Sequence, residues 1–180
     1  MNKIIAIVGM CGSGKSIASD ILVEKGYEKV YFGGVTMEKL KENNLEVTPE
    51  NEKMMREKLR ADLGMGAFAK ILLPRIKEYA KTKDVVLDGL YSWDEYQILS
   101  EELGEELKMI AIVADKELRY RRLSEREVRP LTREEAKNRD LAEIENIRKA
   151  PPIAYADYYV LNNGTIEEYK TRLEEILKEI

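Results

Sequence analysis

The octet Gly9-Met10-Cys11-Gly12-Ser13-Gly14-Lys15-Ser16 decides the fold of this 180-residue chain. It matches the pattern G-x-x-x-x-G-K-[ST] at every fixed position. Residues 3–8, which precede it, are a short and mostly β-branched run, typical of a strand buried on both faces. Residues 16–25, which follow it, place apolar side chains at helical spacing and end before Gly26. The sequence therefore predicts a strand, a glycine loop and a helix in succession.

The remainder of the chain alternates between predicted strands and predicted helices. Strands are expected at residues 27–32, 84–88, 107–114 and 158–161. Helices are expected at residues 35–42, 49–60, 67–81 and 115–128, and after the capping residues Ser92, Thr132 and Thr165. This alternation indicates an α/β fold with a parallel sheet, helices on both faces, and ligands outside the carboxyl ends of the strands. No linker divides the chain, so we expect a single domain over residues 1–180.

Composition limits the possible partners. The net charge of -4 gives no general attraction to nucleic acid or to anionic lipid. No apolar run is long enough to cross a bilayer, and strand-like residues begin at Lys3, which leaves no room for a signal peptide. We therefore expect a cytoplasmic protein with no nucleic-acid or membrane partner. Because the chain has no histidine, proton transfer would fall to a carboxylate, a lysine or a tyrosine.

The octet is suited to hold the phosphates of a nucleotide. Its glycines allow backbone conformations in which successive N–H groups converge on one phosphate, and the following helix adds its positive dipole end. Lys15 can reach the β- and γ-phosphates, and the Ser16 hydroxyl can bind Mg²⁺. An incidental glycine turn is the alternative. The expected cofactors are ATP and Mg²⁺, and the expected nucleotide-binding residues here are Gly9, Cys11, Gly12, Ser13, Gly14, Lys15, Ser16 and Ile17.

Asp88 ends the predicted strand at residues 84–88. In this architecture a carboxylate at that place can hold a water of the Mg²⁺ shell or contact the phosphate acceptor. Gly89 would let a ligand approach the backbone closely. The alternative is an aspartate that caps a helix or a turn. We interpret Asp88 as a catalytic and metal-binding residue.

Four arginines recur at intervals of three, four and three residues, which places them on one face of a helix: Arg119, Arg122, Arg126 and Arg129. Like charges along one face repel each other, and phosphate oxygens would relieve that repulsion. A mobile lid could supply such cations to the transferred phosphoryl group while excluding water. The alternative is a solvated helix neutralised by Glu117, Glu125 and Glu127. We assign Arg122 and Arg126 to catalysis and Arg122 also to nucleotide binding.

Arg56 and Arg60 lie one helical turn apart in the helical region between the second and third predicted strands. Two cations at this spacing are suited to hold a phosphate on the acceptor. As an alternative, they are ordinary surface arginines. We interpret both as acceptor-binding residues.

Together, the octet, the helical insertion, Val86-Leu87-Asp88-Gly89, the arginine-rich segment and the terminal stretch 156–165 (Ala-Asp-Tyr-Tyr-Val-Leu-Asn-Asn-Gly-Thr) resemble the small P-loop kinases of the dephospho-CoA kinase-like and adenylate kinase-related group. The resemblance covers essentially the whole chain. It implies a three-layer P-loop NTPase fold whose five-stranded parallel sheet has the order 2-3-1-4-5. It also implies an acceptor-binding insertion at about residues 35–66, an arginine-rich lid at about 119–139, and adenine contacts from Asn162, Asn163 and Gly164.

One stretch departs from this group. Relatives commonly carry an Asp, and a few residues later an Arg, just after the second strand, whereas residues 32–37 of this chain (Phe-Gly-Gly-Val-Thr-Met) contain neither. A sugar hydroxyl gains from a carboxylate base, whereas an acceptor phosphate needs mainly positioning. Asp88 would therefore have to serve a dephospho-CoA kinase as its carboxylate, and the missing Arg weakens an ordinary monophosphate kinase. The expected acceptor-binding residues are Gly33, Gly34, Arg56, Arg60, Asp88, Gly89 and Arg129.

These observations predict an ATP-dependent phosphotransferase for a small nucleotide-like acceptor, in a monomer or a weak homodimer. Dephospho-CoA or a close analogue is the first choice of acceptor, and a nucleoside monophosphate is the second. A regulatory ATP-binding protein without turnover is the alternative from another class. A GTP-driven switch is disfavoured, because the sequence contains neither Asn-Lys-x-Asp nor Asp-x-x-Gly.

Overall fold

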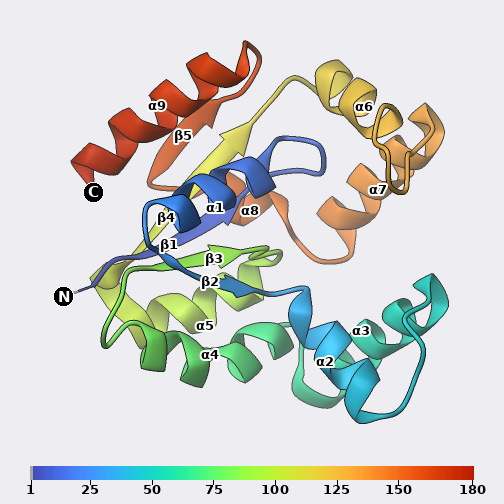
Figure 1. The fold of residues 1–180 in the computed structure, drawn as a ribbon. Coiled ribbons are helices and arrows are strands. Elements are labelled where there is room, and N and C mark those ends of the chain that lie inside the picture. Colours follow the sequence, from blue (N-terminus) through green and yellow to red (C-terminus); the bar gives the residue numbers. More distant parts are fainter. Residues whose placement is uncertain (1) are drawn as a thin grey trace.

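Five parallel strands form the centre of the protein in the order β2-β3-β1-β4-β5 (Figure 1). The computed structural model describes residues 2–180. The strands are β1 (Ile4–Val8), β2 (Glu28–Tyr31), β3 (Val85–Asp88), β4 (Leu107–Val113) and β5 (Tyr158–Leu161). The predicted fold class and strand order are therefore confirmed. Because the strands are parallel and in register, their carboxyl ends meet at one edge of the sheet.

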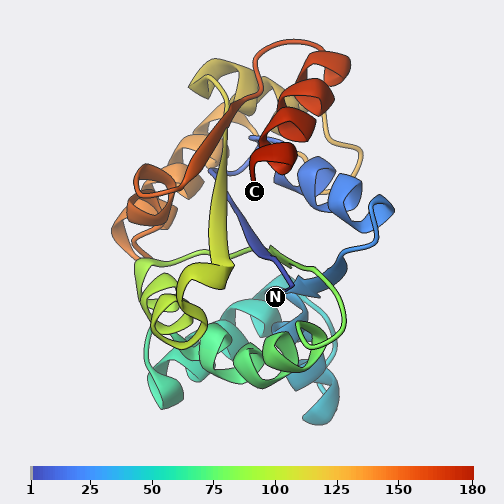
Figure 2. The same ribbon diagram turned by 90° about the vertical axis from the view of Figure 1, so that its left-hand side faces the viewer.

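Helices cover both faces of this sheet. One face carries α1 (Lys15–Glu24) and α9 (Ile166–Glu179), which lie together on the right-hand side of the strands in Figure 2. The other face carries α2 (Gly34–Glu42), α3 (Pro49–Leu63), α4 (Ala67–Tyr79) and α5 (Trp93–Leu103), with the short α8 (Ala150–Ala154) beside α5. The 3₁₀ turn Gly104–Glu106 leads into β4, and α6 (Lys116–Ser124) and α7 (Arg133–Glu145) extend beyond the carboxyl edge.

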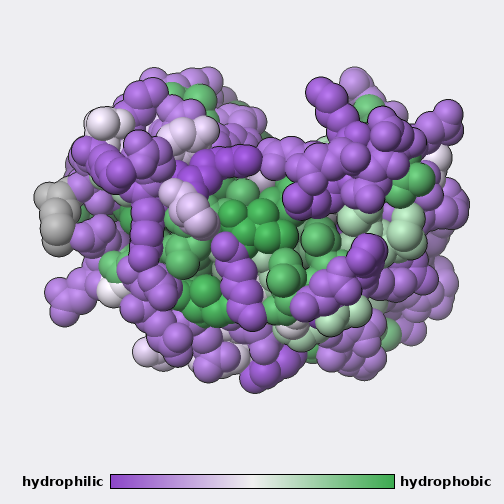
Figure 3. Space-filling model, turned by 90° about the horizontal axis from the view of Figure 1, so that it is seen from below, coloured by the Kyte–Doolittle hydropathy of each residue, from purple (hydrophilic) through white to green (hydrophobic). Residues whose placement is uncertain are grey.

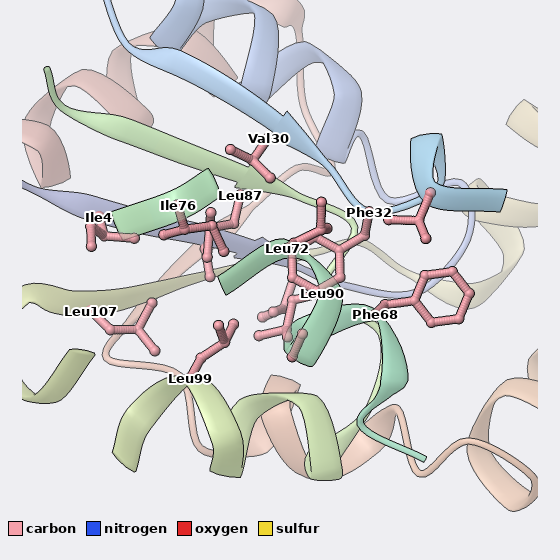
Figure 4. Packing of buried hydrophobic residues seen from close by; sticks show 14 of the residues in the cluster. Ile4, Val30, Phe32, Phe68, Leu72, Ile76, Leu87, Leu90, Leu99 and Leu107 are labelled. Atoms are coloured by element: carbon pink, nitrogen blue, oxygen red, sulfur yellow. The ribbon is translucent and has the colours of Figure 1, made fainter. Parts of the chain in front are cut away.

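The side chains of β1 divide the core into two clusters. Ile4, Ala6 and Val8 point to the α2–α5 side, where Figure 4 shows part of the packing. Ile5 and Ile7 point to the α1 and α9 side. All five are buried, as expected for a central strand of a parallel sheet. This packing fixes the place where β1 ends and the glycine loop begins.

The predicted helix starts are confirmed by their caps. Thr48 accepts a hydrogen bond from the backbone N–H of Asn51, with Pro49 at the first helical position. Capping boxes, in which side chain and backbone bond reciprocally, occur at three further helix starts. They pair Ser92 with Glu95, Thr132 with Glu135, and Thr165 with Glu168.

The prediction of one helix over residues 115–128 is wrong at its end. The helix α6 ends at Ser124, and the chain folds back so that the N–H of Leu131 donates to the carbonyl of Leu123. Leu131 thereby packs against a small apolar cluster that includes Leu123. If residues 125–130 continued the helix, they would carry Leu131 away from this cluster. Arg126 and Arg129 therefore lie outside the helix, with φ of +53° at Arg129, and do not share a helix face with Arg119 and Arg122.

The α4 and α5 side of the molecule carries a hydrophobic area bordered by hydrophilic residues (Figure 3). Partly buried side chains of these helices, including Ile71, Leu73 and Ile98, pack against the core cluster from outside. The apolar surface of α4 is therefore continuous with the core beneath it.

Within residues 2–180, no helix is both long enough and apolar enough to cross a membrane.

Adjacent leucines on α4 provide a test of this packing. We expect Leu72→Ala to lower the free energy of unfolding by about 3 kcal/mol, because Leu72 is buried within the cluster and its loss leaves a cavity. The matched variant Leu73→Ala removes a rim side chain and should cost less than half as much. Chemical denaturation measures both values. If both variants lost the same free energy of unfolding, the assignment of Leu72 to the buried cluster and of Leu73 to its edge would be contradicted.

Candidate functional site

Three glycines shape the loop between β1 and α1. Gly9, Gly12 and Gly14 have φ angles of +148°, +80° and +103°, a region that disfavours side chains. A Cβ at Gly9 would also lie 2.4 Å from the carbonyl oxygen of Ile112, and one at Gly14 would lie 2.4 Å from Nδ2 of Asn162. Conformation and space therefore both require glycine in this loop.

Side chains from the end of the chain bond the carbonyl groups of the loop. Asn162, just after β5, donates from Nδ2 to the carbonyl of Ser13 at 2.8 Å. The Tyr169 hydroxyl on α9 donates to the carbonyl of Gly14 at 3.0 Å. Asn162 is buried in this contact. Its predicted contact with adenine stays a prediction, because the described atoms show it supporting the loop.

A third donor to the loop comes from α6. Arg119 donates from Nη1 to the carbonyl of Cys11 at 3.0 Å and forms a buried, two-pronged ion pair with Asp140 of α7 at 2.9 and 2.6 Å. The interpretation of Arg119 as a lid arginine on a ligand-facing surface is therefore wrong. Its guanidinium instead ties the loop to α7.

The amino end of α1 is open to an anion. The first N–H groups of a helix have no partner within the helix, and in the described part of the chain no side chain caps α1. Ser16 and Ile17 are exposed in its first turn, while the buried Ser13 hydroxyl has no hydrogen-bond partner among the described atoms. A phosphate fits this cradle of N–H groups, and the exposed Ser16 hydroxyl suits Mg²⁺.

Lys15 is the charged group of this cradle. Its Nζ donates to the carbonyl of Met10 at 2.9 Å. Burial, together with the nearby charge of Lys149, lowers the pKa of Lys15 to about 7, although the charges of Glu143 and Asp88 act in the opposite direction. The protein thus leaves this ammonium group without full compensation. A bound phosphate would supply the missing negative charge.

Asp88 lies beside the loop at the carboxyl edge. It ends β3 and is paired in register with Ile7 of β1, two residues before the loop starts. Its Oδ2 forms an ion pair of 2.9 Å with Nζ of Lys29 on β2, which also contacts Asp20 of α1 at 3.2 Å. Gly89 follows with φ of +96°, which turns the chain away from the strand. The predicted neighbourhood of Asp88 and the loop is present.

Lys149 is a second cation near Lys15 that the sequence analysis missed. Its side chain is only 2% exposed, and its Nζ lies 2.6 Å from Oε2 of Glu143 and 5.1 Å from the centre of the Tyr91 ring. An ammonium group over an aromatic face is stabilised by the ring electrons. The pair of Lys149 and Glu143 therefore anchors the end of α7 beside the glycine loop.

A strained turn places Lys149. Arg148 has φ of +53°, its carbonyl accepts a hydrogen bond from the N–H of Trp93 at 3.3 Å, and its guanidinium lies 3.7 Å from Asp94. A non-glycine residue in this conformation needs support from its surroundings. The amino end of α5 supplies that support and fixes the turn between α7 and α8.

Two predicted acceptor residues meet at Glu52 on α3. Arg56 lies 3.5 Å from one carboxylate oxygen of this buried residue and Arg129 lies 3.2 Å from the other. The contact of Arg129 connects the segment after α6 to the helical insertion. Arg60 is not part of this group, because its guanidinium lies over the Phe68 ring at 5.4 Å.

The two predicted catalytic arginines both reach the loop region. Arg122 contacts Oδ1 of Asn162 at 3.4 Å, and its buried Nη1 has no hydrogen-bond partner in residues 2–180. Arg126 approaches the Cys11 sulfur at 3.8 Å, although it lies beyond the end of α6. Cys11 itself is buried against Leu123 and its neighbours, so its side chain helps to seat the loop on α6.

The remaining predicted residues lie at the rim. A Cβ at Gly33 would lie 2.4 Å from the far end of the exposed Tyr31 side chain, which can move aside, and Gly34 is the first residue of α2. Asn163 accepts a hydrogen bond from the N–H of Asp115 at 2.9 Å, and Gly164 is exposed beside it. None of these contacts defines a role toward a ligand.

Glu95 is a further missed residue on the acceptor side. Oε2 accepts hydrogen bonds from the N–H groups of Tyr91 and Ser92 at 2.8 and 3.1 Å. The side chain is fully buried, and burial raises the pKa of Glu95 to about 7, while these bonds and the charge of Arg60 act to lower it. The capping-box pattern at residues 92–95 indicated that Glu95 bonds the start of the helix, but it did not indicate that the side chain is buried.

Comparison with known proteins agrees with this geometry. The family model described as AAA domain matches residues 5–147. A UPF0200 protein of Sulfurisphaera tokodaii is 36% identical over 182 residues, which covers 99% of this chain and 97% of that protein. The fold is similar to that of dephospho-CoA kinase from Campylobacter jejuni, with a TM-score of 0.63, 18% identity, and 99% and 97% of the two chains covered. It is also similar to shikimate kinase from Bacteroides thetaiotaomicron, with a TM-score of 0.60, 15% identity, and 99% of each chain covered.

The glycine loop can be tested by adding one methyl group. We expect Gly14→Ala to weaken ATP binding by about 100-fold, because the loss of aligned N–H donors removes charge-assisted hydrogen bonds of roughly 1.5–3 kcal/mol each. The matched variant Gly26→Ala has a similar positive φ, +94° against +103°, but open space around the new Cβ. It should lower stability by about 1–2 kcal/mol and leave ATP binding unchanged. Isothermal titration calorimetry measures the ATP affinity of both variants. Equal affinities would contradict the steric role of Gly14.

The raised pKa of Glu95 predicts how the free energy of unfolding depends on pH. Its pKa is raised from 4.5 to about 7, so the folded protein binds more protons than the unfolded chain between these values. The free energy of unfolding should therefore fall as the pH rises through this window, by a few kcal/mol from this group alone. Glu95→Gln keeps an oxygen for the two backbone N–H groups but removes the titration. Denaturation at about pH 5 and about pH 7.5 should show the smaller pH effect in the variant, and equal effects would contradict the burial of a titrating carboxyl.

Proposed function

This chain belongs to the family described as AAA domain and to the UPF0200 proteins, and on this premise we propose that it is an ATP- and Mg²⁺-dependent phosphotransferase for a small nucleotide-like acceptor. One observation carries the proposal: an open phosphate cradle and a buried carboxylate share one edge of the sheet. The register of β1 with β3 brings Asp88 beside the loop that Lys15 closes. Donor and acceptor groups would therefore meet in one place.

The chain's own residues divide the work. The loop N–H groups and Lys15 hold the donor phosphates, and Ser16 holds Mg²⁺, which when bound neutralises charge on those phosphates. Arg122 and Arg126 contribute positive charge from the lid side, where Arg122 has an unpartnered Nη1. Asp88 accepts the proton of the attacking group, and Lys29 holds that carboxylate in position.

Dephospho-CoA or a close analogue is the first proposed acceptor. A hydroxyl acceptor needs a carboxylate base, and Asp88 supplies one at the edge where Gly33 offers no side chain. A nucleoside monophosphate is the second candidate. It is favoured by Arg56 and Arg129, two guanidinium groups that meet at Glu52 and suit a phosphate on the acceptor.

Catalysis by Asp88 is tested in an ADP-release assay with dephospho-CoA, AMP, CMP, UMP and dTMP as acceptors. With the active acceptor, we expect Asp88→Asn to lower kcat by about 10²–10⁴-fold, because the variant cannot accept a proton. The control Asp84→Asn changes the carboxylate next to the opposite end of β3, where an oxygen that accepts from Lys3 N–H is retained, and kcat should stay within about twofold. If the unmodified protein binds ATP but releases no additional ADP with any of these acceptors, the proposed function is contradicted and a regulatory role is favoured.

A further inference from the structure

Glu52 of α3 joins the two sides of the carboxyl edge. Its Oε1 lies 3.2 Å from Nη2 of Arg129, which belongs to the segment between α6 and α7. The helix α3 lies on one side of the strand ends, and the α6–α7 pair lies on the other side (Figure 1). The insertion and the segment expected to form a lid therefore touch through this ion pair, next to the edge that carries Asp88 and the glycine loop.

Two guanidinium groups share the Glu52 carboxylate. Arg129 contacts Oε1, and Nη1 of Arg56, one turn further along α3, lies 3.5 Å from Oε2. Only 8% of the Glu52 side chain is exposed, against 64% for Arg129 and 39% for Arg56. Guanidinium groups bind carboxylates and phosphates with the same N–H groups. Glu52 therefore occupies donors that a phosphate needs, on two arginines that solvent and a ligand can reach.

Stability does not account for a carboxylate at this position. The buried residues of α3 are Glu52, Met55 and Leu59, which recur at helical spacing, and the two apolar ones belong to the core cluster. A carboxylate in such a row loses its hydration, and ion pairs with exposed arginines return little of that cost. Its charge also repels any phosphate that binds nearby. Local conflicts of this kind are expected at functional sites.

The backbone at Arg129 directs this side chain to α3. Its φ of +53° is disfavoured for a residue that has a side chain. The turn is nevertheless fixed, because the N–H of Leu131 donates to the carbonyl of Leu123 and Leu131 packs against the apolar cluster beside it. An anion that binds Arg129 and Arg56 at the same time therefore holds the whole segment between α6 and α7 against the insertion.

We propose that Glu52 stands in for the acceptor's phosphate while the site is empty, and that the phosphate displaces it from Arg56 and Arg129 when the acceptor binds. This inference rests on the proposed function, since it states how the same site admits its acceptor. A phosphate monoester brings about 1.5–2 negative charges and three acceptor oxygens at pH 7, more than the single charge and two oxygens of a carboxylate. An acceptor without a phosphate leaves the ion pairs of Glu52 in place, so this residue selects for an anionic acceptor.

Equilibrium binding tests the exchange without any need for turnover. The donor site is first filled with Mg²⁺ and a non-hydrolysable ATP analogue, and calorimetry then measures the affinities for AMP, CMP, UMP, dTMP, dephospho-CoA and adenosine. We expect Glu52→Gln to tighten binding of the phosphate-bearing acceptor by about tenfold, a change of about 1.4 kcal/mol, because the amide keeps the shape of the side chain but has no charge that competes. Adenosine, which has no phosphate, should show no change. If Glu52 only held the arginines in place, the same variant would weaken binding.

Further variants identify the residues that take part. Glu57→Gln makes the same chemical change at an exposed position of α3 and should leave the affinity within about twofold of the wild type. In an Arg129→Gln background, the effect of Glu52→Gln should fall below about threefold, because the exchange needs both partners. Thermal unfolding shows whether each variant is folded. If Glu52→Gln does not fold, Glu52→Asp takes its place, since the shorter side chain withdraws the carboxylate from the arginines and should tighten binding by at least about threefold.

The inference is overturned if Glu52→Gln, or Glu52→Asp in its place, weakens acceptor binding or leaves it unchanged. It is also overturned if adenosine gains as much affinity as AMP, if Glu57→Gln or the Arg129→Gln background gives the full effect, or if no phosphate-bearing acceptor binds. Acceptor-dependent ADP release decides the proposed function separately. The exchange can hold in a protein that binds an acceptor without transferring phosphate, and turnover can occur in a protein whose acceptor binding is weakened by Glu52→Gln.

Discussion

The structure depends on how the carbonyl groups of the glycine loop are held. Four carbonyls, of residues 10, 11, 13 and 14, accept hydrogen bonds from the side chains of Lys15, Arg119, Asn162 and Tyr169. These donors come from α1, α6, the residue after β5, and α9. A loop held from outside by its oxygens keeps its N–H groups available for an anion, and this arrangement explains why the elements around the carboxyl edge converge on it.

Charge around the site is organised in pairs. Three buried or partly buried cations near the edge have their own carboxylates, in the pairs of Lys149 with Glu143, Arg119 with Asp140 and Lys29 with Asp88. Such pairs fix geometry more than they add stability, because desolvation offsets much of their attraction. Among residues 2–180, Lys15 has no comparable partner, and it is the cation that would face the donor phosphates.

Local patterns in the sequence predicted the local parts of the molecule. The octet and the capping residues Ser92, Thr132 and Thr165 depend on neighbours within a few positions, whereas the strand order followed from the resemblance to small P-loop kinases. The arginine periodicity misled because it carries no information about where α6 ends. Lys149 and Glu95 were missed because their positions depend on a turn and on burial that join distant parts of the chain, and no spacing records such contacts.

The bond from Tyr169 to the loop has a consequence for synthesis on the ribosome. The loop is translated about 150 residues before two of the groups that hold it, Asn162 and Tyr169. The central strand β1 likewise has no strand to pair with until β3 and β4 have been translated. The contacts that hold the loop can therefore be completed only after α9 has left the exit tunnel, and until then the loop lacks the support that it has in the folded protein.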